Sequence, residues 1–365
     1  MQLTSFIQTH NDWEKILSEP PYCVKIKRDG GYVIFSYNQI LSDFSLEIVR
    51  ECRGVILDEQ TFKPVCVPFY KFGNYGESYV PDIDWTSARV QEKIDGSLIK
   101  LWYDKGAWHV STSGTIDAKT AILTPTDLFE ENCPYISYGD LFEQARKLAG
   151  LDFDRLDKNL VYMFELVSPY NKVVIMYDKL EIYHIGTRDM STLDELDVDI
   201  GIKKPKQFAI NSLEDCIAQA KNLPSDKEGY VVVDKNFNRI KVKNPVYVAL
   251  HHLKNNGVAS VSGIVPIIRS NEIDEFTTYF PEFKSAVYDC KNKIDGIIAQ
   301  LDETARELSK KTFATQKDFA LEVKDKFLCR YYFEWFRDNK LSAREWFWRL
   351  PDEKIVKILG LSDGN

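Results

Sequence analysis

The sequence predicts an α+β fold, with an antiparallel-sheet-rich domain over residues 1–250 and an all-α domain over residues 251–365. In the first part, short runs rich in β-branched and aromatic residues alternate with turn-forming residues. Runs of strands with inserted helices are typical of domains built on antiparallel sheet. In the second part, apolar residues recur at intervals of mostly three and four, as they do on one face of a helix.

The strands of the first domain are expected where its β-rich runs lie. Asp104-Lys105-Gly106 is a turn-forming triplet, so the runs on either side of it are expected to pair as a hairpin. Two stretches, 138–149 and 211–222, are expected to be helices. The strands are expected at residues 32–37, 53–57, 98–103, 108–112, 160–166, 173–176, 181–185, 230–233 and 239–243.

The second domain is expected to contain one long helix near residues 283–308. Ser342 and Glu345 have the spacing of a capping box, which satisfies free amides at a helix start. Gly360 is expected to end the last helix. The long helix is predicted by an apolar face made of Phe283, Val287, Cys290, Ile294, Ile297, Ile298, Leu301, Ala305 and Leu308.

Composition limits the classes of protein to which this chain can belong. Its seven cysteines include no Cys-x-x-Cys pair, which favours reduced thiols over a disulfide framework or a zinc site. There is no signal-peptide pattern at the start and no run of about 18 apolar residues. We therefore expect a cytoplasmic protein (in the host cytoplasm if phage-encoded) that does not enter a membrane. Nothing in the sequence requires a partner chain, so we expect a monomer.

Charge argues against a protein that coats nucleic acid, because the net charge is -8. It leaves room for a local basic groove. Residues 201–256 carry ten lysines or arginines against five acids, an excess that fits either such a groove or an ordinary solvated face.

The pattern Lys-x-Asp-Gly occurs three times, beginning at Lys27, Lys93 and Lys293. The first copy joins two β-rich runs and reads as a hairpin turn. The third lies inside the long helical pattern, with Lys293 toward solvent. The middle copy also lies between two strands, and taken alone it is best explained as another hairpin turn.

The residues that follow the middle copy favour a chemical role for Lys93. A lysine is a poor nucleophile while protonated, because its ordinary pKa is about 10.4. Neighbouring cations or burial must remove that proton. Lys241 and Lys243 alternate on one strand face and can supply a positive field for the lysine and for a phosphate. Glu165 can hold a ribose hydroxyl, and Glu228 can hold a metal ion or orient the lysine.

These residues resemble the motifs of the covalent nucleotidyltransferases, the superfamily of ATP-dependent ligases and RNA capping enzymes. Lys93-Ile94-Asp95-Gly96, Phe164-Glu165, Glu228-Gly229 and Lys241-Val242-Lys243 are similar to motifs I, III, IV and V. The stretches around Tyr37, Arg53 and Lys71 also match, so the resemblance covers most of residues 30–255. Within the superfamily, the chain is most similar to the tRNA-repair RNA ligases of bacteriophages, the RNA ligase 1 type.

The resemblance implies an ATP-grasp-like ligase domain and a three-step reaction. The Lys93 amine would attack the α-phosphorus of ATP to form lysyl-AMP, the AMP would pass to a 5′-phosphate RNA end, and a 3′-hydroxyl end would displace it. The catalytic residues would be Lys93, Lys241 and Lys243, and Mg²⁺, or Mn²⁺ in its place, would assist. The residues that bind ATP would be Tyr37, Arg53, Lys71, Lys119, Asp95, Gly96, Glu165 and Glu228.

The second domain would then be linked to RNA or tRNA specificity, with broken tRNA as one substrate. Asp274 and Glu275 align with acidic metal ligands of the family, although a helix start favours such a pair by itself. Trp335, Trp346, Phe347 and Trp348 either stack on bases or fill a helical core, and the core is the commoner arrangement.

One departure from the family pattern is Gly73, where the phage ligases have a second phenylalanine. Any stacking by that ring would be lost here or moved to Tyr75. A DNA ligase or capping enzyme would continue into an OB-fold, which a helical tail argues against. A DNA-end ligase and a non-catalytic module that binds RNA ends remain the alternatives.

Overall fold

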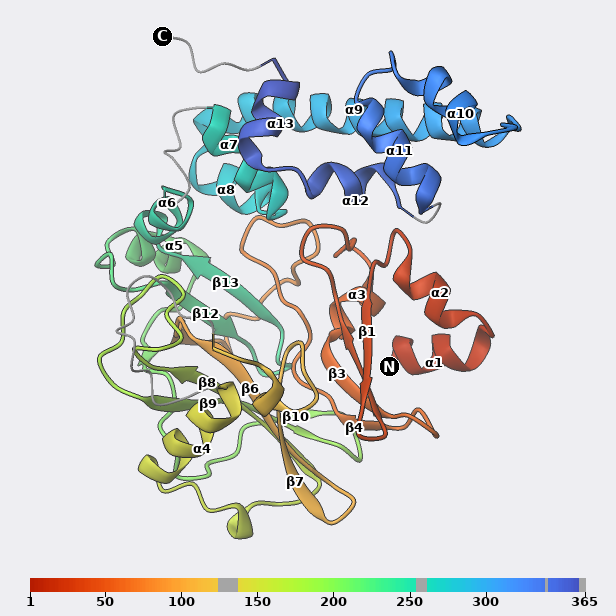
Figure 1. The fold of residues 1–365 in the computed structure, drawn as a ribbon. Coiled ribbons are helices and arrows are strands. Elements are labelled where there is room, and N and C mark those ends of the chain that lie inside the picture. The colour runs from red at the N-terminus through yellow and green to blue at the C-terminus, as the bar shows by residue number, and fades with distance from the viewer. Residues whose placement is uncertain (124–136, 254–260, 339–340, 361–365) are drawn as a thin grey trace. The chain divides into compact units, whose positions relative to one another are not determined.

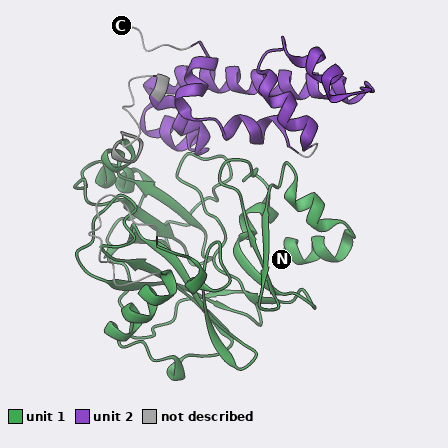
Figure 2. Ribbon diagram, viewed as in Figure 1, with its two compact units in different colours: residues 1–250 green, residues 251–365 purple. Residues whose placement is uncertain are grey.

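The computed structural model describes residues 1–123, 137–253, 261–338 and 341–360. The chain divides into two compact units, Met1–Leu250 and His251–Asn365 (Figure 2). Antiparallel sheets dominate the described part of the first unit, and the described part of the second is helical (Figure 1). The predicted α+β class is therefore confirmed.

The first sheet has the order β1-β2-β3-β4 and antiparallel pairing throughout. Val33 and Phe35 face a core that includes the N-terminal helices, whereas Tyr32 and Ile34 face a second core that Trp102 of another sheet shares. Alternation along a strand thus lets this sheet pack on both faces. Its strands are β1 (Lys25–Asp29), β2 (Tyr32–Ser36), β3 (Arg53–Asp58) and β4 (Pro64–Cys66).

The second sheet has five strands in the order β10-β9-β8-β6-β7. Strands β6 and β7 form the predicted hairpin, in which Lys105 and Gly106 take positive φ values of 48° and 86°. The strands are β6 (Ser97–Asp104), β7 (Ala107–Thr112), β8 (Leu160–Val167), β9 (Glu181–Asp189) and β10 (Glu195–Leu196).

The third sheet has the order β11-β5-β12-β13, again antiparallel. Its core contains Val90, Val232 and Ile240 together with Cys216 and Ala220 of a helix. The strands are β5 (Arg89–Glu92), β11 (Gln207–Phe208), β12 (Gly229–Val233) and β13 (Arg239–Lys243).

Two predicted helices of the first unit are confirmed as α4 (Tyr138–Leu148) and α5 (Leu213–Lys221). Ser137 and Ser212 cap them by accepting hydrogen bonds from the N–H groups of Asp140 and Asp215. Helices α1 to α3 were not predicted. The remaining elements of the first unit are α1 (Gln2–Thr9), α2 (Trp13–Ser18), α3 (Glu47–Glu51), the 3₁₀ turns η1 (Ala118–Thr120) and η2 (Phe153–Arg155), and α6 (Pro245–Leu253), which runs across the unit boundary.

The second unit is built around the predicted long helix, α9 (Lys284–Ser309), whose apolar face is buried. Ser342 caps α12 by accepting from the Glu345 N–H, and Gly360, with φ of 64°, follows the last helix. Trp346, Phe347 and Trp348 are buried, so the core interpretation is correct for these three rings, whereas Trp335 is half-buried. The other helices are α7 (Val261–Arg269), α8 (Ile273–Tyr279), η3 (Pro281–Phe283), α10 (Gln316–Val323), α11 (Cys329–Arg337), α12 (Ala343–Trp348) and α13 (Asp352–Ile358).

One predicted strand, at residues 173–176, is wrong. The N–H groups of Val174 and Ile175 both donate to Asp95 Oδ2, at 2.9 and 2.7 Å, instead of to a neighbouring strand. Val173 and Met176 are exposed. A buried carboxylate therefore replaces the strand partner that an apolar run normally finds.

Across the described ranges, no helix is long and apolar enough to span a membrane.

Candidate active site

The segment Lys93–Gly96 carries the chain from one sheet to another. It follows β5 in the third sheet and precedes β6 in the second, so the two strands that flank it do not pair. The Lys93 N–H donates to the Gly229 carbonyl at 2.9 Å, which ties the segment to the start of β12. The hairpin interpretation is therefore wrong for this copy of Lys-x-Asp-Gly.

The other two copies lie where the sequence predicts. Asp29 pairs with Tyr32 across a tight turn in which Gly30 and Gly31 have φ values of 57° and 81°. Such values favour glycine. Lys293 is exposed within α9, and Ile294 beside it is fully buried.

Gly96 is required because the chain passes against β8 at this point. A Cβ atom on Gly96 would lie 2.5 Å from the Leu166 carbonyl oxygen and 2.8 Å from a methyl of Val167. Only a residue without a side chain permits that approach. The same contact brings Glu165, which pairs across the sheet with Leu98, to within 3.1 Å of the Cβ position.

Glu228 lies between Lys93, which follows β5, and Lys243 at the end of β13. Its Oε2 accepts a hydrogen bond from Lys93 Nζ at 2.6 Å, and its Oε1 lies 4.0 Å from Lys243 Nζ. The Glu228 side chain is 5% exposed, and those of the two lysines are 20% and 15% exposed. A carboxylate removed from water in this way requires cationic partners, which both lysines supply.

Lys241 is half-buried among other cations. Burial lowers its pKa well below the ordinary value, and the charges of Lys71, Lys93, Lys243 and Arg53 lower it further. Its Nζ lies 4.9 Å from the centre of the Phe72 ring. The cations around Lys241 repel its charge, and a bound phosphate would offset that repulsion.

Arg53 begins β3, and the centres of the Phe69 and Phe72 rings lie 4.5 and 5.6 Å from its guanidinium carbon. Its Nη1 is buried and makes no hydrogen bond within the described part of the chain. A buried donor without an acceptor is costly, so this nitrogen fits an anionic ligand. Lys71 lies between Phe69 and Phe72 in the sequence. Its Nζ is 4.2 Å from the centre of the Phe44 ring and 5.2 Å from the centre of the Tyr37 ring.

One pocket gathers residues from all three sheets. It is lined by both charged and apolar side chains, which suits a nucleotide with a flat base and a charged tail. Lys241 comes from the third sheet and Lys93 directly follows β5 of that sheet, whereas Glu165 comes from the second sheet and Arg53 from the first. The apolar lining includes Phe69, Phe72, Ile185 and Val231.

Burial raises the pKa of Glu165 to about 7. The charges of Lys93 and Arg53 oppose that rise, and the charge of Glu228 adds to it. Glu165 therefore changes charge near neutral pH and can either accept or donate a hydrogen bond to a hydroxyl group.

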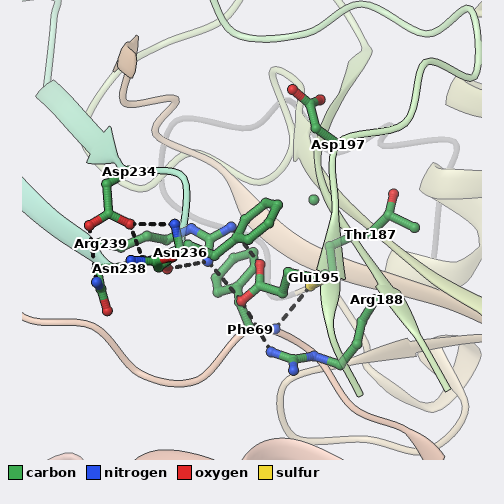
Figure 3. Close-up of polar contacts among 12 residues, drawn as sticks. Phe69, Thr187, Arg188, Glu195, Asp197, Asp234, Asn236, Asn238 and Arg239 are labelled. Carbon is green, nitrogen blue, oxygen red and sulfur yellow. Dashed lines mark hydrogen bonds and ion pairs between the residues drawn. The ribbon is translucent and has the colours of Figure 1, made fainter. Parts of the chain in front are cut away.

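A buried ion cluster includes Arg239, which lines the pocket, and lies near Phe69 (Figure 3). Glu195 on β10 accepts from Arg239 Nη1 at 2.8 Å and from Arg188 Nη2 at 3.1 Å, and all three side chains are less than 10% exposed. The Arg239 guanidinium carbon lies 5.0 Å from the Phe69 ring centre. The cluster fixes an arginine that lines the pocket and joins the second sheet to the third.

Asp95 positions the segment and does not line the pocket. Its Oδ1 accepts from the Tyr247 hydroxyl at 3.0 Å, and its Oδ2 accepts the two backbone N–H groups described above. The Asp95 N–H donates to the Tyr177 hydroxyl at 3.2 Å. These contacts fix the backbone that follows Lys93, just as β5 fixes the backbone that precedes it.

Lys119 lies outside the pocket, and two other predicted site residues, Asp274 and Glu275, belong to the second unit. Lys119 is exposed on η1, where its stem packs against Gly139 of α4, and it does not line the pocket. Asp274 and Glu275 lie in the first turn of α8, in the second unit. Asp274 Oδ1 accepts from the Tyr288 hydroxyl at 2.9 Å.

The described residues include no group of three or more His, Cys, Asp or Glu side chains that is placed to hold a metal ion. One carboxylate together with substrate phosphates is nevertheless a common way to bind Mg²⁺. Glu228 fits that arrangement.

Gly73 cannot be exchanged for a larger residue without local movement. A Cβ there would lie 2.5 Å from a Glu77 oxygen and 2.6 Å from a Val80 methyl. The Gly73 carbonyl accepts from the Lys241 N–H at 3.0 Å, so the segment runs along β13. Tyr75 packs against the core of the third sheet, so its ring does not replace the missing phenylalanine at the pocket.

Sequence reasoning missed Arg239, Phe69, Glu195 and Lys100. Two of them left a signal in the sequence. Arg239 shares the strand face of Lys241 and Lys243, and a period of two identifies it. Lys100 interrupts the apolar run Leu98-Ile99-Lys100-Leu101-Trp102 and is completely buried.

No family model matches the chain. Several curated proteins are similar to it in sequence. A predicted bifunctional polynucleotide kinase/RNA ligase of Autographa californica nuclear polyhedrosis virus is 29% identical over 282 residues, which cover 72% of this chain and 40% of the viral protein. The RNA ligase of Rhodothermus phage RM378 is 25% identical over 402 residues, covering 88% of each chain. A predicted RNA ligase of Thermovibrio ammonificans is 26% identical and covers 62% of this chain and 60% of its own.

The chain is a distant homologue of RNA ligases. It spans less than half of the viral protein and most of the phage ligase. The narrower assignment to the tRNA-repair type of bacteriophages remains a prediction. A solved archaeal ATP-dependent RNA ligase has a TM-score of 0.45 at 15% identity, covering 69% of this chain and 66% of its own, which is too distant to define the fold.

Proposed function

We propose that this chain is an ATP-dependent RNA ligase that joins 5′-phosphate and 3′-hydroxyl RNA ends through a lysyl-AMP on Lys93. The observation that carries the proposal is the contact of Lys93 Nζ with Glu228, together with the pocket that Lys93 lines with Glu165, Lys241 and Arg53. Distant homology to RNA ligases supports the substrate class.

In the first step, the lone pair of the Lys93 amine forms a bond to the α-phosphorus of ATP. The bond between that phosphorus and the bridging oxygen breaks, and pyrophosphate leaves with the electron pair. The Lys93 amine also loses a proton, which passes to water. Glu228 Oε2 orients the amine, and Lys241, Lys243 and Arg53 stabilise the negative charge that develops on the phosphates.

In the second step, an oxygen of the 5′-phosphate RNA end attacks the phosphorus of lysyl-AMP. The phosphorus–nitrogen bond breaks, and Lys93 recovers its proton. In the third step, the 3′-hydroxyl oxygen attacks the activated 5′-phosphorus, AMP leaves, and the hydroxyl proton is released. Glu165 lines the same pocket as Lys93 and Arg53, and it would hold a ribose hydroxyl of AMP by a hydrogen bond in all three steps.

The remaining assignments follow the same site. Tyr37 and Lys71 would contact ATP, and Lys119 would reach it only if η1 moved toward the pocket. Glu228, with the phosphates of ATP, would hold Mg²⁺ or Mn²⁺, which supplies further charge stabilisation when bound. Asp274 and Glu275, in the second unit, would be the further acidic metal ligands that the resemblance implies, or a pair that a helix start favours by itself. The helical unit would select the RNA, and broken tRNA in the cytoplasm would be one substrate.

The deciding experiment mixes the full chain with Mg²⁺ and α-labelled ATP and measures the label on the denatured polypeptide. Lys93→Ala is compared with Lys27→Ala and Lys293→Ala, which alter the other two Lys-x-Asp-Gly copies. We expect label on wild type and on both controls and none on Lys93→Ala. A folded wild-type protein that takes no label from any nucleoside triphosphate would overturn the mechanism and favour a non-catalytic module that binds RNA ends.

The polymer is tested separately by supplying nicked or broken RNA, a broken tRNA and the corresponding DNA. We expect sealed product with RNA ends. Sealing of DNA ends alone would replace this function with that of a DNA-end ligase.

A further inference from the structure

A second pocket adjoins the first, and Arg53 lines both. Its cavity volume is about 270 Å³. It opens beside β1, an edge strand of the first sheet. The residues that matter here are Lys25, Lys27, Ser36, Tyr37, Arg53 and Ser113.

The lining of this pocket is cationic. Lys25 and Lys27 alternate on β1, so their side chains leave the same face of the strand. Both are exposed, and within the described ranges neither makes an ion pair. Lys27 Nζ donates to the Gly114 carbonyl at 3.1 Å, which brings it over the pocket wall. No carboxylate lines the pocket, so its field favours an anion.

Lysines on an edge strand also discourage unwanted strand pairing, and that role alone would not require a pocket. Two further features point to a ligand. Arg53 Nη1 is buried without a partner among the residues described, and it belongs to a side chain shared with the candidate ATP pocket. Ser36 Oγ donates to the Ser113 carbonyl at 2.7 Å, which fixes the opposite wall.

We propose that this Lys25–Lys27 pocket binds a phosphate of the RNA strand during joining, with Lys25 and Lys27 as RNA-binding residues. The inference rests on the proposed function. RNA is favoured over the pyrophosphate released from ATP because the two lysines are solvent-exposed on an edge strand, where a polymer can lie along them. The half-buried Lys93 and Lys241 lie in the other pocket.

The test measures binding of a 5′-phosphorylated single-stranded RNA to the full chain, by fluorescence anisotropy, as a function of salt. One phosphate contact to a single strand contributes about 0.7 to the slope of log affinity against log salt. We therefore expect Lys25→Ala/Lys27→Ala to reduce the slope by about 0.7 and to weaken binding about 5-fold at about 0.1 M salt. Lys25→Arg/Lys27→Arg should retain wild-type binding because the charge remains.

A matched control is Lys15→Ala/Lys63→Ala, which removes two exposed lysines outside the pocket. Equal effects of the two double variants on the slope would overturn the proposal. A second outcome would also overturn it. If Lys25→Ala/Lys27→Ala is labelled more slowly by ATP and inhibited less by pyrophosphate, while its RNA binding is unchanged, the pocket holds pyrophosphate. A wild type that takes no label would overturn the ligase function, and the binding comparison would still decide this proposal.

Discussion

Lys100 Nζ donates a hydrogen bond to the Gly54 carbonyl from a completely buried position on β6. Gly54 is the extra residue of a bulge, because Phe35 pairs with Val55 and Ser36 with Arg53. Its φ is 81°, and a Cβ there would lie 2.7 Å from the Ser113 carbonyl oxygen. Arg53, the preceding residue, enters the candidate ATP pocket. The buried amine thus holds the backbone that aims Arg53.

Lys100→Met should keep the fold and slow formation of lysyl-AMP. Burial lowers the pKa of Lys100 to about 8. Near neutral pH, the charged amine in this buried position therefore reduces the free energy of unfolding. An apolar side chain of similar length removes that cost. The freed bulge would misplace Arg53, and we expect labelling by ATP to fall about 100-fold. Circular dichroism verifies folding, and wild-type labelling rates in a folded variant would show that the bulge needs no such support.

The three Lys-x-Asp-Gly copies allow one substitution to be tested in three backbones. Gly296→Ala, in the middle of α9, meets no atoms and should stabilise the protein by up to about 1 kcal/mol. Gly30→Ala must take a left-handed φ and should cost about 1 kcal/mol. Gly96→Ala would press on β8 beside Glu165, and we expect a loss of about 1–3 kcal/mol with much slower labelling.

Urea denaturation and labelling by ATP, run on all three glycine variants, separate stability from function. Labelling should fall only in Gly96→Ala. A Gly30→Ala protein that loses labelling while remaining folded would contradict the assignment of the first copy to a plain turn.

The sequence predicted most strands because they alternate or are flanked by clear turns. The β6–β7 hairpin around Asp104-Lys105-Gly106 and the long helix α9 are examples. The motif residues Lys93, Glu165, Glu228 and Lys241 were singled out by order and residue type, and the fold brings them close together.

The failures came from partners that lie far away in the sequence. Nothing local shows that Asp95 takes the N–H groups of residues 174–175, which removed one predicted strand. Nor does local sequence show that β5 and β6 belong to different sheets, because a strand–turn–strand pattern fits a hairpin and a crossing equally well. Glu195 lies on a two-residue strand, too short for any periodicity to reveal.

Glu165 should make the free energy of unfolding depend on pH, and Glu165→Gln should remove this dependence. Its pKa is about 7 in the folded state and 4.5 ordinarily. Between these values the folded state holds a proton that the unfolded state has lost, so the free energy of unfolding falls as pH rises from 4.5 to 7. The advantage of Glu165→Gln over wild type should grow across this window, by at most about 3 kcal/mol, and then level off.

Urea denaturation at several pH values between 4.5 and 8 measures this difference. Glu214→Gln, an exposed carboxylate on α5, is the control and should show no such trend. A difference between Glu165→Gln and wild type that stays constant with pH would mean that Glu165 is ionised throughout the range.

Glu195 and Asp197 offer a matched pair, because each carboxylate serves two cations. Glu195 is buried between Arg188 and Arg239, whereas the Asp197 side chain is 50% exposed beside Arg89 and Lys204. Removal of the shared acid from a buried cluster leaves two uncompensated charges, so Glu195→Ala should cost about 3–5 kcal/mol. Asp197→Ala should cost at most about 1 kcal/mol, because water screens an exposed pair.

Urea denaturation compares the two alanine variants, with Glu195→Gln as a milder change should Glu195→Ala not fold. Because Arg239 lines the pocket and depends on Glu195 for its position, Glu195→Gln should also raise the ATP concentration needed for half-maximal labelling. Asp197→Ala should leave that concentration unchanged. Equal stability losses for Glu195→Ala and Asp197→Ala would show that Arg188 and Arg239 find other partners or water once the shared carboxylate is gone.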